Sequence, residues 1–293
     1  MGGKPIISLA ELRKQAVYRL RKVYPLSESE SIIRALFSHF IPEWPKVWLA
    51  SSGQAPFPEE LLPRWENAIA RLLRHEPLAY IIGEVAFGSI RLEITPGVFI
   101  PRPETEEWAY RLRQMLSKSP PKTILDIGTG SGALAIFFAK EFPYSMVYAI
   151  DKSPKAVNLA RKNAFLNSCS IRVEQVTFGA SPLPTYFPHK WDLIVCNPPY
   201  VPWINYAETG LNVRLYEPPD AIFCSGLSLY EKLAEMATKH LSPGGIIAAE
   251  LFPPDAEAVA SLWEAYGLHT ALYKDSQERL RWIEAKIRHL SPP

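Results

Sequence analysis

The sequence predicts an α/β protein in which a small helical domain precedes a larger domain built on a mostly parallel sheet. Three observations support this prediction. From residue 123 onward, short apolar runs alternate with helical stretches, as in a parallel sheet covered on both faces. Residues 8–75 show only helical spacing, and residues 78–100 approach a period of two. The 293 residues are enough for about two domains.

Three amphipathic helices are expected within the first 75 residues. Ser8 with Glu11 and Ser27 with Glu30 have the capping-box spacing, and a third helix is expected from about Pro58. Each helix carries an apolar stripe, so the three can pack into a small bundle. The connection between the second and third helices is expected to be a loop that can hold a short helix.

The change of period in residues 78–100 predicts a β-hairpin, centred on Gly88, that links the two domains. Pro101 and Pro103 then open a helix whose first turn is rich in glutamate, which a helix N-terminus favours electrostatically. This run is a good helix start, and it could equally form a lip over a ligand pocket. The expected divisions are a helical domain at 1–77, a hairpin linker at 78–101 and a catalytic domain at 102–293.

In the larger domain, strands are expected at 123–127, 146–151, 171–176, 191–196, 244–251, 268–274 and 279–286. Helices are expected at 131–141, 153–166, 226–241 and 255–266.

A glycine-rich turn, Asp126 to Gly132, follows the first of these strands with the spacing G-x-G-x-G. Its glycines allow a tight turn and close approach to a ligand, with a helix N-terminus just behind. Ala133 stands where a nicotinamide-type turn would need its last glycine. Asp151, at the end of the next strand, is placed to take a pair of ribose hydroxyls. An adenosyl ligand without a pyrophosphate therefore fits better than a dinucleotide.

The fourth strand ends abruptly in Asn197-Pro198-Pro199-Tyr200, because two prolines cannot continue a strand. The Asn197 side-chain oxygen and the freed carbonyls form a cluster of acceptors beside an aromatic ring. Such a cluster suits a planar NH2 group, either an amide or the exocyclic amine of a base. Taken alone, the tetrapeptide is explained more simply as a strand end with Tyr200 packed on it. The glycine turn and Asp151 at the same sheet edge shift the balance to a methyl-transfer site.

Composition narrows the class of protein. The net charge is +2 without a Lys/Arg arm, which argues against tracking a phosphate backbone. Three separated cysteines and six scattered histidines give no disulfide framework and no metal-ligand spacing, so no metal is expected. No apolar run approaches the roughly 18 residues of a membrane span. Residues 1–6 resemble neither a signal peptide nor a myristoylation site, so the expected location is the cytoplasm.

Five segments carry a more specific pattern: Glu76 to Gly83, Ile100 to Glu106, the glycine turn, Asn197 to Tyr200, and Arg214 to Pro218. With these motifs the chain resembles, over nearly its whole length, the release factor glutamine N5-methyltransferases, a branch of the S-adenosylmethionine-dependent enzymes. The resemblance implies a Rossmann-like seven-stranded sheet with an antiparallel last strand, and a monomer. The implied substrate is the glutamine of the Gly-Gly-Gln motif in a peptide chain release factor.

The resemblance also implies site residues. Asn197, Pro198 and Tyr200 are the expected catalytic residues, with Pro199 also at the substrate. The expected cofactor residues are Asp126, Gly128, Thr129, Gly130, Ser131, Gly132, Asp151, Phe178 and Asn197. Phe178 is aligned with an aromatic position that packs on adenine, and Tyr200 is expected to pack on the amide face. The helical domain and the 203–215 loop are expected to hold the protein partner.

The chain departs from the family pattern in three places. Thr177 replaces an acidic residue, Phe252 interrupts the usual Glu-x-Gly pattern after Glu250, and the segment 221–227 is poorer in glycine. Three alternatives stay open: a glutamine methyltransferase acting on a ribosomal protein, an amino-methyltransferase of DNA or RNA, and a non-catalytic binding module. The near-neutral charge counts against the second alternative, and the intact motifs count against the third.

Overall fold

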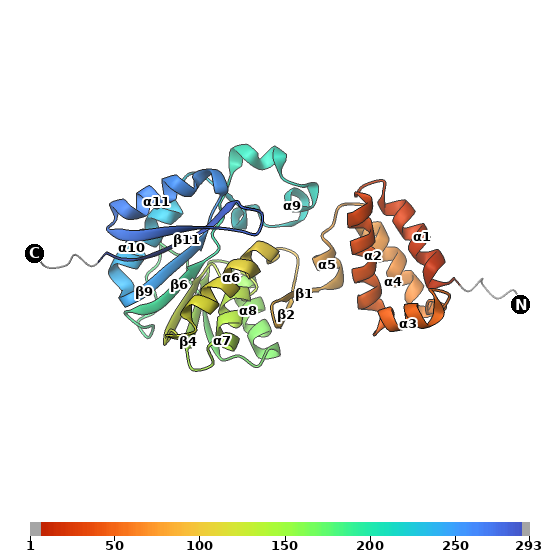
Figure 1. Ribbon diagram of the computed structural model, residues 1–293, viewed down its shortest axis with the longest axis horizontal. Helices are drawn as coiled ribbons and strands as arrows, with labels where there is room; N and C mark the ends of the chain where they lie inside the picture. Colours follow the sequence, from red (N-terminus) through yellow and green to blue (C-terminus); the bar gives the residue numbers. More distant parts are fainter. Residues whose placement is uncertain (1–6, 289–293) are drawn as a thin grey trace, which may run out of the picture. The chain divides into compact units, whose positions relative to one another are not determined.

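The computed structural model describes residues 7–288, which fall into two compact units (Figure 1). The first unit contains the chain up to Gly83 together with Gly210–Tyr216, and the second contains the remainder. Residues 1–6, for which no signal peptide is expected, lie outside the described range. Among the described helices, none has the length and apolar character needed to cross a membrane.

The first unit is a helical bundle. Its elements are α1 (Leu9–Leu20), α2 (Leu26–Phe40), α3 (Trp44–Ser51), a short 3-10 helix η1 (Glu59–Leu61), α4 (Leu62–Leu72), α5 (Leu78–Ile82) and α9 (Leu211–Tyr216). Phe37 and Trp65 stack at the centre, with ring centroids 4.9 Å apart. The Ser8 hydroxyl accepts from the Glu11 N–H, as expected of a cap. The predicted cap at Ser27 is wrong, because α2 already begins at Leu26, behind Pro25.

The helix α9 belongs to this bundle although it is distant in sequence. The Tyr216 hydroxyl donates to the Arg74 carbonyl at 2.9 Å. The predicted catalytic domain, 102–293, includes these residues, because neighbouring positions in the sequence give no sign that seven residues leave one unit for another.

The second unit begins with the hairpin β1 (Glu84–Phe87) and β2 (Ile90–Glu93), which pair antiparallel. Residues 78–82, expected within the hairpin, form α5 instead. The outer edge of β2 meets two side-chain amides of α8 (Pro154–Leu166) and its C-cap. Asn163 exchanges two hydrogen bonds with the backbone of Glu93, and Asn167 exchanges two with that of Arg91.

A seven-stranded sheet forms the core of the second unit, in the order β10-β11-β9-β6-β3-β4-β5. The strands are β3 (Thr123–Ile127), β4 (Met146–Asp151), β5 (Ile171–Gln175), β6 (Trp191–Cys196), β9 (Leu241–Glu250), β10 (Leu268–Lys274) and β11 (Leu280–Ile287). The last strand, β11, runs antiparallel to both neighbours, whereas the pairs from β9 to β5 are parallel. This agrees with the fold that the resemblance implied.

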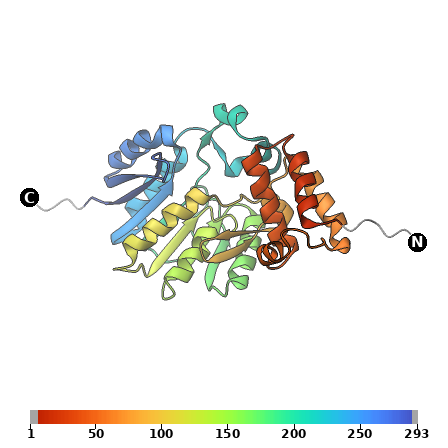
Figure 2. The ribbon, with the colours of Figure 1, turned by 45° about the vertical axis from the view of Figure 1, so that its right-hand side comes forward.

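Helices cover both faces of the sheet, as Figures 1 and 2 show. On one face lie α6 (Pro103–Leu116), α7 (Ala133–Glu141) and α8, and on the other lie α10 (Ser228–His240) and α11 (Ala256–Ala265). Between β6 and α10, a two-stranded parallel ribbon of β7 (Val201–Pro202) and β8 (Phe223–Cys224) spans the base of a long excursion. That excursion contains the 3-10 helices η2 (Trp203–Glu208) and η3 (Pro219–Ala221), together with α9. Because β3, β4, β6 and β9 are parallel, their carboxyl ends lie along one edge of the sheet, where such folds bind ligands.

Candidate functional site

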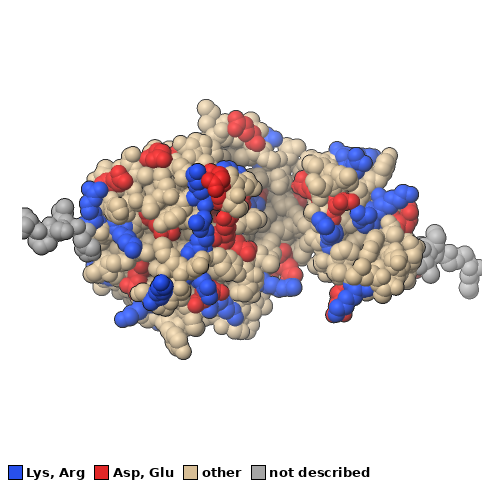
Figure 3. All heavy atoms as spheres, in the orientation of Figure 1, with Lys and Arg blue, Asp and Glu red and all other residues tan. Residues whose placement is uncertain are grey.

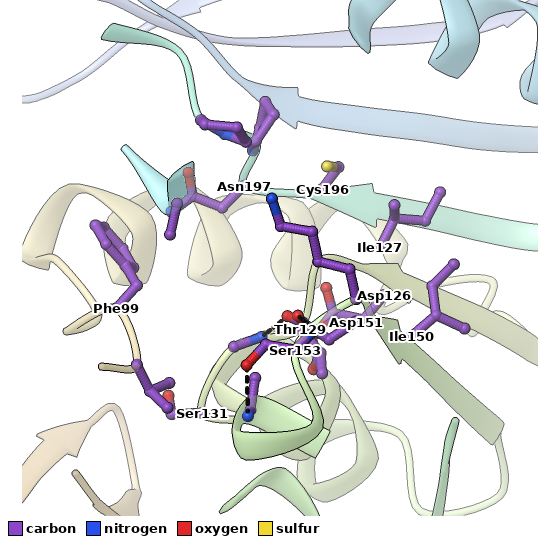
Figure 4. Close-up of a pocket in the computed structure, with 18 of the residues that line it drawn as sticks. Phe99, Asp126, Ile127, Thr129, Ser131, Ile150, Asp151, Ser153, Cys196 and Asn197 are labelled. Atoms are coloured by element: carbon purple, nitrogen blue, oxygen red, sulfur yellow. Dashed lines mark hydrogen bonds between the residues drawn. The ribbon is translucent and has the colours of Figure 1, made fainter. Parts of the chain in front are cut away.

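A pocket of about 370 Å³ opens at this edge, within the second unit (Figure 4). It brings together most of the residues singled out from the sequence: Asp126, Gly128, Thr129, Gly130, Ser131, Asp151, Phe178, Asn197, Pro198 and Pro199. Gly132 and Tyr200 are not among its lining residues. Ile127 and Ile150 lie on the side of the pocket opposite Phe99 in Figure 4.

The glycine turn is shaped to face a ligand. Gly128 and Gly130 have φ angles of +73° and +56°, which favour glycine, and a Cβ added at either would meet no atom within 4 Å. The Gly128 and Thr129 amides both donate to the Ile150 carbonyl, at 2.8 and 3.0 Å. Gly132 instead allows close packing against α8, because a Cβ there would lie 3.2 Å from the backbone of Ala160.

Asp151 holds the glycine turn in place. Its two carboxylate oxygens accept from the backbone amides of Gly130, at 2.9 Å, and Ser153, at 2.8 Å. The Ser153 hydroxyl in turn caps α8 by accepting from the Ala156 amide at 3.3 Å. Burial raises the pKa of Asp151, and these backbone donors oppose that rise. A carboxylate oxygen can accept more than one hydrogen bond, so Asp151 can also accept from ribose hydroxyls.

Asp126 presents an unpaired acceptor at the pocket. One of its oxygens accepts from the Thr129 hydroxyl at 2.7 Å and from the Ala135 amide at 3.1 Å. The other oxygen is buried and has no hydrogen-bond partner among the described residues, and the same is true of the Ser131 hydroxyl. Burial raises the pKa of Asp126 to about 7. Two unpaired polar groups beside an open glycine turn fit a polar, positively charged ligand such as the methionine part of S-adenosylmethionine.

Asn197 lies at the end of β6, where the prolines stop the strand. Its Nδ2 donates to the Thr105 hydroxyl at 3.0 Å, and that hydroxyl donates to Glu250 at 2.6 Å. The Tyr200 hydroxyl donates to the other oxygen of Glu250 at 2.9 Å. Burial, and next the nearby Glu250, raise the pKa of Tyr200 well above its ordinary value. The hydroxyl of Tyr200 is thus engaged with a buried carboxylate, and its expected stacking on a substrate amide stays a prediction.

The proline-rich start of α6 does form a wall of the pocket, which the sequence alone left open. Phe99, Pro101 and Thr105 line the cavity. The Arg102 guanidinium lies 4.8 Å from the centre of the Phe99 ring and forms an ion pair with the buried Glu217. Glu217 also accepts from the Ile100 amide at 3.2 Å, which ties this wall to the segment where Pro218 and Asp220 line the pocket.

Sequence reasoning missed three contributors: Phe99, Thr105 and Glu250. The motif containing Thr105 was singled out, but nothing in its sequence indicates which residue faces the pocket. Thr177, the departure noted beside Phe178, also lines the cavity. Within residues 7–288, no group of three or more His, Cys, Asp or Glu side chains is placed to hold a metal ion.

The sequence matches two family profiles. One is the PrmC N-terminal domain, over residues 11–83, and the other is the methyltransferase small domain, over residues 90–213. Among solved structures, a T. thermophilus 16S rRNA N2 G1207 methyltransferase in complex with AdoMet and guanosine superimposes with a TM-score of 0.51 at 16% identity. That match covers 70% of this chain and 50% of the other, and at this identity it shows the fold alone.

Two curated relatives cover nearly the whole chain. The release factor glutamine methyltransferase of Flavobacterium psychrophilum is 34% identical, over 94% of this chain and 98% of its own. The enzyme of the same name from Deinococcus radiodurans is 31% identical, over 96% of this chain and 99% of its own. The chain therefore belongs to the release factor glutamine methyltransferase family and is an S-adenosylmethionine-dependent methyltransferase.

Proposed function

We propose that this chain methylates the side-chain amide nitrogen, N5, of the glutamine in the Gly-Gly-Gln motif of a peptide chain release factor. One observation supports this most directly. The Asn197 amide has its nitrogen bonded to Thr105, so its oxygen is the group left to accept a bond at the pocket. A planar amide NH2 matches that acceptor, and the relatives are named for this substrate class.

The glycine turn and its neighbours are proposed to hold the cofactor. S-adenosylmethionine supplies a methyl group that is already activated by its positively charged sulfonium. The unpaired oxygen of Asp126 would accept from the cofactor's amino group, and Asp151 would accept from its ribose hydroxyls. Phe178 would pack on the adenine, and Gly128 and Gly130 leave room for the chain of the ligand.

Asn197 and Pro198 are proposed to act on the substrate amide. A carboxamide nitrogen is a poor nucleophile because its lone pair is delocalised into the carbonyl. If its two N–H groups donate to the Asn197 oxygen and the Pro198 carbonyl, the nitrogen is fixed in position and polarised as charge develops on it. The N–CH3 bond forms as the S–CH3 bond breaks, S-adenosylhomocysteine is the leaving group, and the amide nitrogen gives up one proton to solvent; the residues at the site supply the orientation.

The protein partner is proposed to dock on the helical unit and on the 203–215 loop. In the second unit, this loop exposes Trp203, Ile204 and Tyr206, with 48%, 89% and 37% of their surface accessible. Trp203 is held by stacking on Phe223, with ring centroids 4.9 Å apart. Rigid, exposed aromatic residues of this kind are typical anchors of protein interfaces. The loop follows directly after Tyr200 and β7.

We further propose that the enzyme acts as a monomer in the cytoplasm and does not bind nucleic acid. On the face drawn in Figure 3, Lys and Arg side chains are interspersed with Asp and Glu. A backbone-tracking nucleic-acid enzyme would instead need a continuous basic field. The net charge of +2 agrees with this.

The test is methyl transfer from labelled S-adenosylmethionine to four acceptors: purified release factor, its Gly-Gly-Gln→Gly-Gly-Ala variant, ribosomal protein, and bulk RNA or DNA. Each is assayed with the wild type and with Asn197→Ala. We expect label on wild-type release factor only, and a loss of at least ~10²-fold with Asn197→Ala, since the positioning acceptor is gone.

Other outcomes would redirect the assignment. Label on nucleic acid would move it to a base amino-methyltransferase. Label on ribosomal protein but not on release factor would keep the glutamine chemistry and change the partner. If no acceptor is labelled while the cofactor binds, the proposed substrate is wrong.

A further inference from the structure

We propose that Thr105 is a positioning residue that determines the orientation of the Asn197 side-chain amide. It does so through a chain of hydrogen bonds from Asn197 to Thr105 to the buried Glu250. The inference rests on the proposed function, because it explains how the acceptor at the pocket is kept in place. All the residues concerned lie in the second unit.

The chain starts from a carboxylate removed from solvent. Glu250 is 0% exposed and Thr105 2% exposed, so neither side chain can exchange its partner for water. One oxygen of Glu250 accepts from the Thr105 hydroxyl at 2.6 Å and from the Trp108 indole N–H at 3.1 Å. The other oxygen accepts from the Tyr200 hydroxyl at 2.9 Å. The carboxylate therefore has three donors.

Counting protons fixes the direction of every bond. The ionised Glu250 has no proton to donate, so the oxygen that Trp108 and Thr105 share accepts from both of them. The single hydroxyl proton of Thr105 goes to that oxygen, which leaves only lone pairs for Asn197. The group of Asn197 that lies 3.0 Å from Thr105 must then be its NH2, and its oxygen must face away from Thr105. A reversed amide would set two acceptors against each other in a dry site.

A reversed Asn197 amide would also point its NH2 into the pocket, where it would face the NH2 of the substrate amide and could not accept a hydrogen bond from it. Thr105 thus orients the acceptor at the pocket through Asn197, whereas Trp108 and Tyr200 bind the carboxylate and have no hydrogen bond to the Asn197 side chain among the described residues. This difference separates a positioning role from a merely structural one. In a structural role, loss of either donor to Glu250 would lower stability and activity together.

The experiment compares Thr105→Val, Thr105→Ser and Trp108→Phe, alone and combined with Asn197→Ala. We expect Thr105→Val to lower kcat by ~10²-fold, with the dissociation constant of S-adenosylmethionine changed less than ~threefold, since only orientation is lost. Thr105→Ser restores the hydroxyl and should restore kcat. Trp108→Phe, the matched control, should lower the melting temperature yet keep kcat near that of the wild type.

The combined variants give the decisive result. If Thr105 acts through Asn197, adding Thr105→Val to Asn197→Ala should cost nothing further in kcat. Equal and additive losses would overturn the proposal, as would an unchanged kcat in Thr105→Val.

A readout without any methyl acceptor separates this proposal from the proposed function. In protein labelled with ¹⁵N-asparagine, the Asn197 side-chain NH2 signals, assigned by their loss in Asn197→Ala, should exchange slowly with solvent in the wild type and in Thr105→Ser. They should exchange quickly in Thr105→Val. Should Thr105→Val not fold, Glu250→Gln serves instead. Its amide oxygen must face Trp108 and Thr105, so the slow exchange at Asn197 should persist. Rapid exchange in folded wild type or in folded Glu250→Gln would overturn the proposal, whatever substrate is methylated.

Discussion

At the scale of single residues, Asp126 links stability, pH and cofactor binding. Its buried carboxyl keeps its proton up to a pH of about 7, whereas the unfolded chain loses it near the ordinary value of 3.8. The free energy of unfolding should therefore fall as the pH rises across that window and level off above it. Affinity for the positively charged cofactor should change the opposite way, rising as the carboxylate forms.

Asp126→Asn should separate these two effects. The Asn oxygen must accept from Thr129 and Ala135, so its NH2 takes the position of the unpaired oxygen. We expect a higher melting temperature than the wild type at pH 8 and a smaller gain at pH 5. Because a donor now faces the cofactor's ammonium group, affinity at pH 8 should fall by ~10-fold or more.

Thermal melts and calorimetric titrations at both pH values check this. Asp192→Asn serves as control, because Asp192 accepts from the backbone amides of Lys122 and Thr123 at the opposite edge of the sheet. It should leave cofactor affinity unchanged. An Asp126→Asn variant that binds S-adenosylmethionine as tightly as the wild type at pH 8 would contradict the role given to the unpaired oxygen.

The pocket brings together most of the site residues predicted from the sequence, but the sequence did not predict how their side chains are oriented. Gly132 was predicted beside the cofactor, yet its missing Cβ serves the contact with Ala160 of α8. The glycine spacing alone cannot distinguish room for a ligand from room for a helix. Thr105 was missed because its importance depends on Glu250, which lies far away in the sequence and meets it only after folding.

At the scale of elements, two asparagines of one helix replace a missing strand. Residues four apart on a helix rise by about 6 Å, and residues two apart on a strand by about 6.6 Å. Asn163 and Asn167 therefore match Glu93 and Arg91 of β2, and each amide both donates and accepts as a strand backbone would. This covers the outer edge of the hairpin, whose two strands pair with no further strand in the described part of the chain.

Asn163→Ala should cost more stability than Asn167→Ala. Asn163 is fully buried and also donates to the Ser131 carbonyl of the glycine turn at 2.9 Å, so its loss leaves buried backbone groups unpaired. We expect the free energy of unfolding to fall by ~2–4 kcal/mol for Asn163→Ala and by ~1 kcal/mol for Asn167→Ala. The smaller loss is expected because water can replace the amide of Asn167.

Urea denaturation of both variants beside the wild type measures this difference. Cofactor affinity should fall only in Asn163→Ala, since only that amide reaches the turn. Equal, small losses would show that the hairpin edge is held by other contacts.

The sequence predicted the strands of the sheet closely, because buried parallel strands are apolar runs bounded by turn residues. It was less successful where a local signal competed with its surroundings. Ser27 has a capping pattern, but Pro25 starts α2 before it. Residues 78–82 have an apolar run that suits either a helix or a strand, and the structure makes it α5.

At the scale of the whole molecule, the proposed docking surface can be tested without disturbing the fold. Ile204, with 89% of its surface exposed, has little to lose in stability when replaced. We expect Ile204→Ser to raise KM for release factor by ~10-fold, about 1.4 kcal/mol, while kcat, the melting temperature and cofactor affinity stay unchanged.

Tyr144→Ser provides the matched control. Tyr144 is 99% exposed, and it precedes β4, at the edge of the sheet opposite the pocket. Steady-state kinetics with release factor as the varied substrate should give a wild-type KM for this variant. If both variants raise KM alike, general surface hydrophobicity and not the 203–215 loop is responsible.

The return of Gly210–Tyr216 to the first unit has a consequence for the order of events during synthesis. A ribosome delivers β3, β4, β5 and β6 before it delivers α9. The bundle that is made first is therefore completed late, although domains usually fold as they emerge. Because the buried core of the bundle lies within residues 9–72, a nascent chain stalled just before Gly210 should already protect its N-terminal helices from protease, and only the contact of Tyr216 with Arg74 has to wait for α9.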